Sequence, residues 1–452
     1  MSSSSPPPPE RNIQRSKRKA SNSPSPILQE DTIKRVKTRD PSLIGDEYDG
    51  KRTISLSLLT PPPSSSNSRS SSALSSTSTI SIPVEMDSPH TYECMGLTPE
   101  AAQLIYNDGK KIRDGIMEDY GEDFDSEFLE CSLEAYLVKR VTEVCDEVLA
   151  AGDGDNWIEA MTAAGIKKEL QDTIMDEEFE AIRGTQSLQG WLKEIFGNYF
   201  RTFEHMNESV LDWEEEYSSR LRLRGGAGEE DIAPPPPGHR ALFKSIEFKQ
   251  AQGIFCDNEI DLVGLVSAST PMDFSPYGGL YFTDTPWVAE VYANFAKRTC
   301  PPADIRTVEI HVPEDHFKRL KVWELEFNDI FKEIVWHSRR GKIIPKHLQE
   351  IQSDFRILHG PCTTRHSKNY AKMKDWNEIT ERHLLTRMTT DEYGAPQQEV
   401  AMQYMWRGQT AVSELSRDCK DKTRLWKPLK GWSLVGEPDK DVSVREKNVL
   451  EG

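Results

Sequence analysis

Residues 277–295 read Tyr-Gly-Gly-Leu-Tyr-Phe-Thr-Asp-Thr-Pro-Trp-Val-Ala-Glu-Val-Tyr-Ala-Asn-Phe and join a glycine turn, a short aromatic strand and a helix. The glycines at 278–279 permit backbone conformations that are closed to other residues. Residues 280–282 are typical of a buried strand, and Thr285 with Pro286 predicts an N-cap and a first helical position. The stretch therefore predicts a strand–turn–helix unit, which either grips a nucleotide or closes a core.

Strand and helix patterns alternate on both sides of this unit, from residue 240 to residue 415. The alternation of Ile and Val over 305–312 is typical of a strand, and Gly360-Pro361 ends another. The predicted elements are strands at 240–245, 305–312, 355–361 and 398–407, helices at 248–254 and 409–415, and a helix or strand at 316–325. Residues 240–415 are therefore predicted to form one α+β domain, followed by a charged tail at 416–452.

The region before this domain has helical periodicity. Thr98 and Pro99 predict a helix start, and apolar residues then recur every three or four positions. One helix carries an aromatic and aliphatic stripe that is typical of a bundle core: Trp191, Ile195, Phe196, Tyr199, Phe200 and Phe203. Residues 95–220 are therefore predicted to be an acidic helical domain, joined to the next domain by a Gly- and Pro-rich linker at 221–239.

Residues 1–94 are rich in Ser and Pro and poor in large apolar side chains. Such a segment cannot offset the entropy lost on ordering, so a disordered head is predicted. Basic clusters at 15–19 and 34–37 are similar to a bipartite nuclear import signal, although an ordinary charged tail has the same composition. The sequence thus predicts a nuclear location, with the cytoplasm as the alternative.

The net charge of −18 is concentrated in the helical region, because residues 95–230 carry 32 acidic and 13 basic side chains. This balance argues against direct nucleic-acid binding, which depends on Lys and Arg neutralising phosphates. It favours a basic protein partner. The seven cysteines include no CxxC pair, which indicates a reducing compartment. Neither a membrane span nor a secretory signal is expected from the hydropathy of the chain.

Residues 221–226, Leu-Arg-Leu-Arg-Gly-Gly, are identical to the last six residues of ubiquitin. The chain before them lacks the alternating strands that a ubiquitin fold requires. A flexible basic junction or a coincidence is favoured over a protease recognition site.

Four segments of the α+β domain, in the same order, resemble the ADP-ribosyltransferase fold, specifically a little-described subgroup from bacteria and fungi. The first is Ala241-Leu242-Phe243-Lys244-Ser245, with its following helix. The second is Gly279-Leu280-Tyr281-Phe282-Thr283, the third is Asp354-Phe355-Arg356-Ile357-Leu358-His359-Gly360-Pro361, and the fourth begins Gln403-Tyr404-Met405-Trp406. The resemblance covers residues 240–415 only and implies a split β-sheet that binds NAD.

The resemblance also implies roles for single residues. Lys244 would hold the nicotinamide ribose, Tyr281 would stack on nicotinamide, and Gln403 would hold a ribose hydroxyl. Gly279 and Thr283 lie in the same strand as Tyr281 and are included in the NAD-binding set. The chemistry needs few groups, because orienting an oxocarbenium-like ribose does most of the work.

Two positions depart from the pattern of active transferases. Lys244 replaces a His, and Gln403 replaces the usual Glu, which an amide cannot match in charge or basicity. Glu399 is four residues earlier in the same predicted strand, so it shares the face of Gln403 and could compensate. Two functions stay open: NAD-dependent ADP-ribosyl transfer or NAD cleavage, and a non-catalytic nuclear interaction protein with a degenerate transferase-like domain.

Metal binding is not predicted. His359, Cys362 and His366 have spacings that suit zinc, but the sequence shows no fourth ligand.

Overall fold

The computed structural model describes residues 44–48, 50–55, 79–113, 132–152, 156–212, 235–256, 259–268, 271–365, 367–390, 393–419 and 423–426. All of these residues belong to one compact unit, Pro41–Gly452. The basic clusters at 15–19 and 34–37 and the ubiquitin-like residues 221–226 lie outside the described residues.

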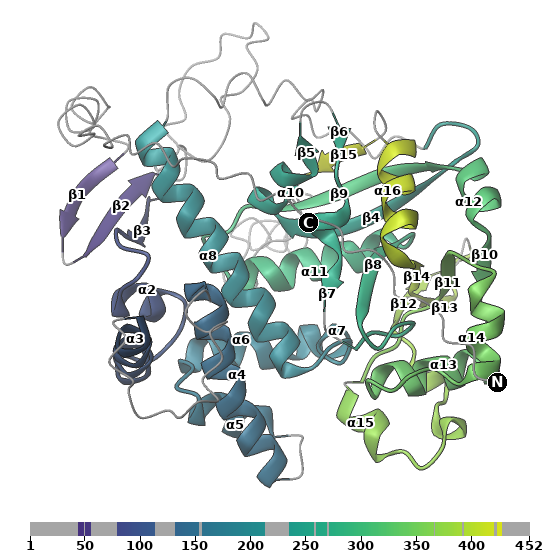
Figure 1. Ribbon diagram of the computed structural model, residues 1–452, viewed down its shortest axis with the longest axis horizontal. Helices are drawn as coiled ribbons and strands as arrows, with labels where there is room; N and C mark the ends of the chain where they lie inside the picture. Colours follow the sequence, from purple (N-terminus) through teal and green to yellow (C-terminus); the bar gives the residue numbers. More distant parts are fainter. Residues whose placement is uncertain are drawn as a thin grey trace, which may run out of the picture. The chain divides into compact units, whose positions relative to one another are not determined.

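The described chain mixes helices and strands, which confirms the α+β class (Figure 1). The strands are β1 (Ile44–Tyr48), β2 (Lys51–Ser55), β3 (Thr79–Pro83), β4 (His239–Glu247), β5 (Phe255–Cys256), β6 (Glu259–Ile260), β7 (Ser267–Ala268), β8 (Gly278–Thr283), β9 (Ile305–Pro313), β10 (Val322–Glu324), β11 (Ile357–Pro361), β12 (Thr386–Thr390), β13 (Pro396–Val400), β14 (Met402–Trp406) and β15 (Thr423–Trp426). The α-helices are α2 (Pro89–Cys94), α3 (Pro99–Arg113), α4 (Leu133–Ala151), α5 (Trp157–Ala163), α6 (Lys168–Met175), α7 (Glu180–Arg183), α8 (Leu188–Asp212), α10 (Phe248–Ile254), α11 (Pro286–Thr299), α12 (Glu314–Leu320), α13 (Asp329–Arg339), α14 (Lys346–Ser353), α15 (Ser367–Lys372) and α16 (Gly408–Asp418). Short 3₁₀ turns are η3 (Glu177–Phe179), η4 (Val263–Leu265), η5 (Trp376–Glu378) and η6 (Glu381–His383).

The largest sheet has the order β10-β11-β14-β8-β4-β9-β15, with β7 paired to β8. The four segments quoted above supply β11, β14, β8 and β4, so they are consecutive neighbours in this sheet. β4 pairs with β9 along its whole length, from His239 to Glu247. It pairs with β8 only at Phe243 and Thr283. The sheet is therefore split between β4 and β8, immediately after Phe243.

The two faces of this sheet are covered by different helices. On one face, which we call the α16 face, Leu242, Phe282 and Trp406 pack with Leu415 of α16 in a single core. On the other, which we call the α11 face, the Ser245 hydroxyl donates to the Ala289 carbonyl of α11 at 2.6 Å. Strand register decides which face each side chain takes, because successive residues alternate.

The strand–turn–helix unit predicted at residues 277–295 forms as β8 and α11, with one difference. Leu280, Tyr281 and Phe282 are buried in β8, and Pro286 is the first residue of α11. Thr285 occupies the N-cap position, but its side chain makes no cap hydrogen bond. Its hydroxyl instead accepts from the Met402 amide of β14 at 3.1 Å. The hydroxyl therefore ties the start of α11 to the last strand.

Residues 79–212, which we call the helical module, contain the predicted helices. The whole aromatic and aliphatic stripe of α8 is buried, as predicted. The ring centroids of Trp191 and of Phe295 on α11 lie 4.5 Å apart. One core therefore runs from the helical module into the α11 face of the sheet.

The predicted boundary of the head is wrong for its structured part. β3 and α2 lie inside residues 1–94, yet Ile82 and Tyr92 are fully buried in the core of the helical module. The Ser- and Pro-rich composition concealed these few apolar positions. The helical module thus begins at least as early as Thr79.

The C-terminal boundaries also differ from the prediction. The strand expected over 398–407 is interrupted at Ala401, whose amide donates to Leu385 outside either strand. β13 pairs with β12 in a separate hairpin, whereas β14 joins the large sheet. α16 continues to Asp418, and β15 adds a strand beside β9, so the domain extends past residue 415 into the predicted tail. Among the described residues, no helix is long and apolar enough to cross a membrane.

Candidate functional site

Gln403 lies on β14, on the α11 face, and is buried. Its Nε2 donates to Asp273 Oδ2 at 2.6 Å and to the Pro361 carbonyl at 3.3 Å. The amide is thus engaged by groups of the protein itself.

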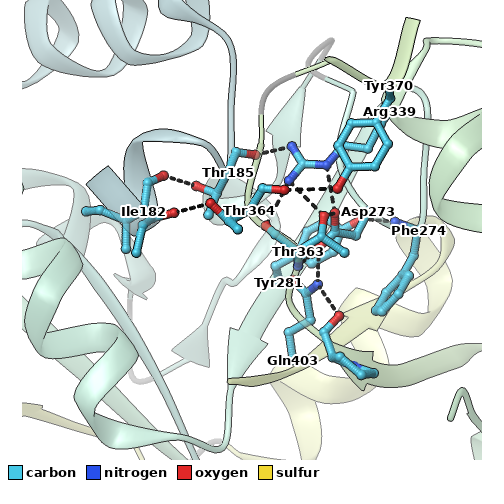
Figure 2. Close-up of polar contacts among 12 residues, drawn as sticks. Ile182, Thr185, Asp273, Phe274, Tyr281, Arg339, Thr363, Thr364, Tyr370 and Gln403 are labelled. Atoms are coloured by element: carbon cyan, nitrogen blue, oxygen red, sulfur yellow. Dashed lines mark hydrogen bonds and ion pairs between the residues drawn. The ribbon is translucent and has the colours of Figure 1, made fainter. Parts of the chain in front are cut away.

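Asp273 is the centre of a buried polar network, shown in Figure 2. Its Oδ1 accepts from Arg339 Nε at 2.7 Å and from the Thr363 hydroxyl at 2.5 Å. Its Oδ2 accepts from the Thr363 amide at 2.8 Å as well as from Gln403. Four hydrogen bonds to one buried carboxylate satisfy both of its oxygens. We call Asp273, Arg339, Thr363 and Gln403 the Asp273 network.

Tyr281 lies beside this network on the same face. Its hydroxyl accepts from the Phe274 amide at 3.2 Å, and the rings of Phe274 and Tyr281 are stacked with centroids 6.3 Å apart. Burial raises the pKa of Tyr281 above its ordinary value, and the nearby Asp273 carboxylate raises it further. The tyrosine is therefore neutral, with its ring and hydroxyl both in contact with Phe274.

Gly279 and Thr283, which also lie on β8 and belong to the predicted NAD-binding set, both contact other parts of the sheet. The Thr283 hydroxyl donates to the Met402 carbonyl at 2.7 Å, which joins β8 to β14. A Cβ at Gly279 would lie 3.3 Å from both Met405 Cγ and Tyr281 Cε2. A side chain at this position would therefore require Met405 or Tyr281 to shift by a few tenths of an ångström.

Glu399 does not join Gln403. It lies on β13, in the separate β12–β13 hairpin, and its Oε2 accepts from Arg387 Nε at 2.7 Å. The guanidinium of Arg387 in turn lies over the Trp287 ring, 5.1 Å from its centroid. The expected compensation by Glu399 fails, because the break at Ala401 separates the two residues into different sheets.

Lys244 does not share the face of Tyr281 and Gln403. It is paired with Val308 in β9, so by register it belongs to the α16 face. Burial lowers the pKa of Lys244, and the carboxyl of Glu194 on α8 opposes this shift. Burial also raises the pKa of Glu194, which accepts from Gln186 Nε2 at 2.9 Å. The predicted NAD-binding set therefore divides between two faces of the split sheet.

The Asp273 network also binds the helical module. Arg339 Nη1 donates to the Thr185 carbonyl, and the Thr364 hydroxyl donates to the Ala181 carbonyl at 2.6 Å. The Thr185 hydroxyl is hydrogen-bonded to the Tyr292 hydroxyl of α11 at 2.6 Å. Figure 2 shows Arg339 pointing toward Thr185 in the turn that follows α7. The network is thus placed where the helical module meets the sheet.

A second polar cluster lies on the α16 face. The ring of His359 stacks on Tyr404 with centroids 4.0 Å apart, and its Nδ1 lies 2.5 Å from Glu324 Oε2. Its Nε2 is 3.3 Å from Asp284 Oδ2. Burial lowers the pKa of His359, but the two carboxylates outweigh it and the net shift is upward. Both ring nitrogens therefore face carboxylates of the protein.

Sequence reasoning missed Asp273 and Arg339. Asp273 lies in a short loop before β8, and Arg339 follows Ser338 at the end of an amphipathic helix, where a charged residue is usually solvated. No local pattern marks either of them. Their sequence separation of 66 residues hides the pair.

Within the described ranges, no group of three or more His, Cys, Asp or Glu residues could hold a metal ion. Residue 366, the third member of the zinc-like spacing, lies outside these ranges. Only His359 and Cys362 of that set are therefore described. Cys362 is buried, and burial raises the pKa of its thiol well above the ordinary value.

Comparisons with protein-family models, with curated proteins and with solved structures found no match to this chain.

Proposed function

We propose that residues 239–419 form an ADP-ribosyltransferase-like domain that serves as a non-catalytic interaction domain together with the helical module. The observation that carries this proposal is the engagement of Gln403 by Asp273 and of Tyr281 by Phe274. The resemblance assigns those two side chains to a ribose hydroxyl and to nicotinamide. A ligand would have to displace a buried carboxylate that has four hydrogen bonds, which leaves buried polar groups unpaired at considerable cost.

The position of the other assigned residues supports the same proposal. Lys244 belongs by register to the opposite face from Gln403, and Glu399 is paired with Arg387 on a separate hairpin. Positioning is the main source of rate in this kind of reaction. A set of polar groups divided in this way does not provide it.

The partner that the charge distribution favours is a basic protein segment. Residues 169–180, which span α6, η3 and α7, present exposed acids at Glu169, Asp172, Glu177, Glu178 and Glu180. Two of them are partly neutralised, Asp172 by Lys168 and Glu178 by Arg298. The basic clusters at 15–19 and 34–37 would direct the protein to the nucleus, where basic protein tails are abundant.

Titration of the full-length chain with a fluorescent oligolysine peptide tests the partner. Binding that weakens with salt is expected, because exposed charges are screened. The double variant Glu177→Lys/Glu180→Lys should weaken it, whereas Glu350→Lys, at a site with 68% side-chain exposure in α14, should not. Equal binding by wild type and the double variant would show that the acidic surface of residues 169–180 does not bind the peptide.

A second candidate function is NAD-dependent ADP-ribosyl transfer or NAD cleavage. It is favoured by the strand order, because the four segments that resemble the transferase fold are neighbours in one sheet that splits beside Phe243. In this reading the Asp273–Phe274 segment would leave Tyr281 and Gln403 when NAD binds.

The two candidates are separated by adding millimolar NAD to the full-length chain. The non-catalytic proposal expects no rise in melting temperature and no nicotinamide release, since a ligand that binds the native state must stabilise it. Nicotinamide release that disappears in Gln403→Ala would establish the second candidate instead. A matched variant, Gln398→Ala on the exposed hairpin, controls for non-specific effects.

A further inference from the structure

We propose that His359 forms a pH-sensitive clamp with Asp284 and Glu324, which holds the edge strand β10 to the large sheet while the histidine is protonated and releases it when the proton is lost. This inference does not depend on NAD binding or on the interaction proposed above. It assigns a regulatory role to a histidine that neither candidate function uses.

The clamp acts on the end of the sheet. β10 contains three residues, Val322–Glu324, and pairs in parallel with β11, which pairs on its other side with β14. In the described sheet β10 is the terminal strand. A strand this short forms few backbone hydrogen bonds, so side-chain contacts contribute much of its attachment.

His359 contacts both β10 and the end of β8. Its Nδ1 lies 2.5 Å from Glu324 Oε2, and its Nε2 lies 3.3 Å from Asp284 Oδ2. The contact with Asp284 is an ion pair without the alignment of a hydrogen bond. The His359 carbonyl also accepts from the Leu325 amide at 2.7 Å. His359 therefore holds two consecutive residues, 324 and 325, at the end of β10.

This arrangement requires a protonated ring. A neutral imidazole has one N–H group and one lone pair, so its second nitrogen would face a carboxylate oxygen with like polarity. An imidazolium presents an N–H group to both carboxylates. Burial lowers the pKa of His359, but Asp284 and Glu324 outweigh this effect and the net shift is upward. The His359 side chain is only 13% exposed, which limits screening of the two ion pairs by salt.

The neighbouring strands and α12 also place titratable groups near the clamp. Tyr404 of β14 stacks on the His359 ring, and burial raises the pKa of Tyr404 to about 12, so it remains neutral. Arg240 of β4 donates to the Tyr404 hydroxyl at 2.6 Å and to Glu314 of α12 at 2.7 Å. The arginine charge is thus balanced by its own partner. We therefore assign the charge change that operates the clamp to His359.

The direction of the switch follows from the sign of the pKa shift. The folded protein binds the His359 proton more tightly than the unfolded chain, in which the histidine has a pKa near 6.5. The stability that the clamp contributes is therefore complete below this value and is lost as the pH rises through the folded pKa. Glu324, whose side chain is 59% exposed, can then turn to water. Release of β10 leaves β11 as the edge strand, with unpaired backbone groups.

Hydrogen-exchange mass spectrometry on the full-length protein tests this proposal. Peptides that contain residues 320–326 are compared at about pH 6 and about pH 8, on either side of neutrality, with labelling times scaled to the intrinsic exchange rate. After this scaling, β10 is expected to exchange several-fold faster at the higher pH. Peptides from β9, which pairs with β4 and β15 on its two sides, should keep the same rate.

Two variants assign the pH dependence to the clamp. Glu324→Gln and His359→Gln should each make β10 exchange fast at both pH values. The matched control is Glu326→Gln, at an exposed carboxylate two residues further along the chain, which should behave as wild type. Because Glu324 is exposed, its variant keeps the test valid even if His359→Gln does not fold. Exchange of β10 that is independent of pH in the wild type excludes the clamp. A pH dependence that persists in Glu324→Gln also excludes it.

Discussion

At the scale of single residues, Arg339 and Asp273 form an almost completely buried ion pair, with side-chain exposures of 1% and 5%. The guanidinium bonds to Asp273, to Thr363 and to the Thr185 carbonyl. Such a pair contributes little compared with an apolar replacement of both partners, but the loss of one partner leaves an uncompensated buried charge. The two cases can be measured separately.

Arg339→Met is expected to lower the free energy of unfolding by about 3–5 kcal/mol, because Asp273 then remains buried without its cation. Adding Asp273→Asn to the same variant should recover part of this loss. Urea unfolding measures both, and Arg417→Met, whose side chain is 67% exposed, serves as the control. If Arg339→Met has the same free energy of unfolding as the control variant, the ion pair does not contribute to stability.

Gln403 permits a second residue-scale prediction. Gln403→Ala should cost about 1–3 kcal/mol, the usual penalty for leaving a buried partner unsatisfied. Gln403→Glu should cost more, because a second carboxylate would face Asp273 at the 2.6 Å contact that the amide now makes. The same substitution on the exposed hairpin, Gln398→Glu, should have little effect in thermal unfolding. A Gln403→Glu variant that is stable and releases nicotinamide from NAD would instead support the enzymatic candidate.

At the scale of elements, His316 joins α12 to β14 and α16. Its Nε2 accepts from Trp406 Nε1 at 3.1 Å, and its Nδ1 lies 2.7 Å from Asp418 Oδ2. This pairing requires the neutral tautomer that carries its proton on Nδ1. Burial lowers the pKa of His316 below 6.5, and this effect exceeds the opposing one of Asp418.

The pH dependence follows from the sign of that shift. Between the unfolded pKa near 6.5 and the lower folded pKa, the unfolded chain binds the proton more tightly. The contribution of His316 to stability is therefore complete above the unfolded pKa and is lost as the pH falls toward the folded one. The urea midpoint should decrease in this window, and His316→Gln should reduce the decrease. His347→Gln, at a histidine with 62% side-chain exposure, should leave the slope unchanged. Identical slopes for all three proteins would contradict the assignment.

The elements also show how far local sequence patterns predict the fold. The β8–α11 unit and α10 form where glycine, Pro286 and apolar periodicity place them, because these signals act on the backbone within a few residues. The break at Ala401 could not be predicted in this way. It depends on the pairing of Cys362 and Leu385 with Ala401 across the chain. For this reason the prediction that Glu399 and Gln403 share one strand face was wrong.

At the scale of the whole molecule, the helical module and the sheet domain share one apolar core. Phe295 of α11 contacts both Phe179 and Trp191 of the module, and Arg298 forms ion pairs with Asp176 and Glu178. Each large side chain exposed by separating the two parts would cost about 1.5–3 kcal/mol. The shared core therefore predicts that the two domains fold as one unit.

This predicts that a fragment of residues 235–452 does not fold by itself. It should lack a cooperative thermal transition and should associate in size-exclusion chromatography, because the aromatic face of α11 becomes exposed. The full-length chain should melt in one transition under the same conditions. A monomeric fragment with a melting temperature close to that of the full chain would contradict this prediction. Ligand tests should accordingly use the full chain.

The sequence by itself determined the β8–α11 unit, α10 and the buried side chains of α8. These properties arise from periodicity and backbone preferences over short stretches. Only the tertiary structure decided what the candidate site residues contact. Gln403 meets Asp273 across 130 residues of sequence, and Lys244 takes the opposite face of a split sheet. Hydrogen-bond partners and strand register are set by packing between distant elements, and no local pattern encodes them.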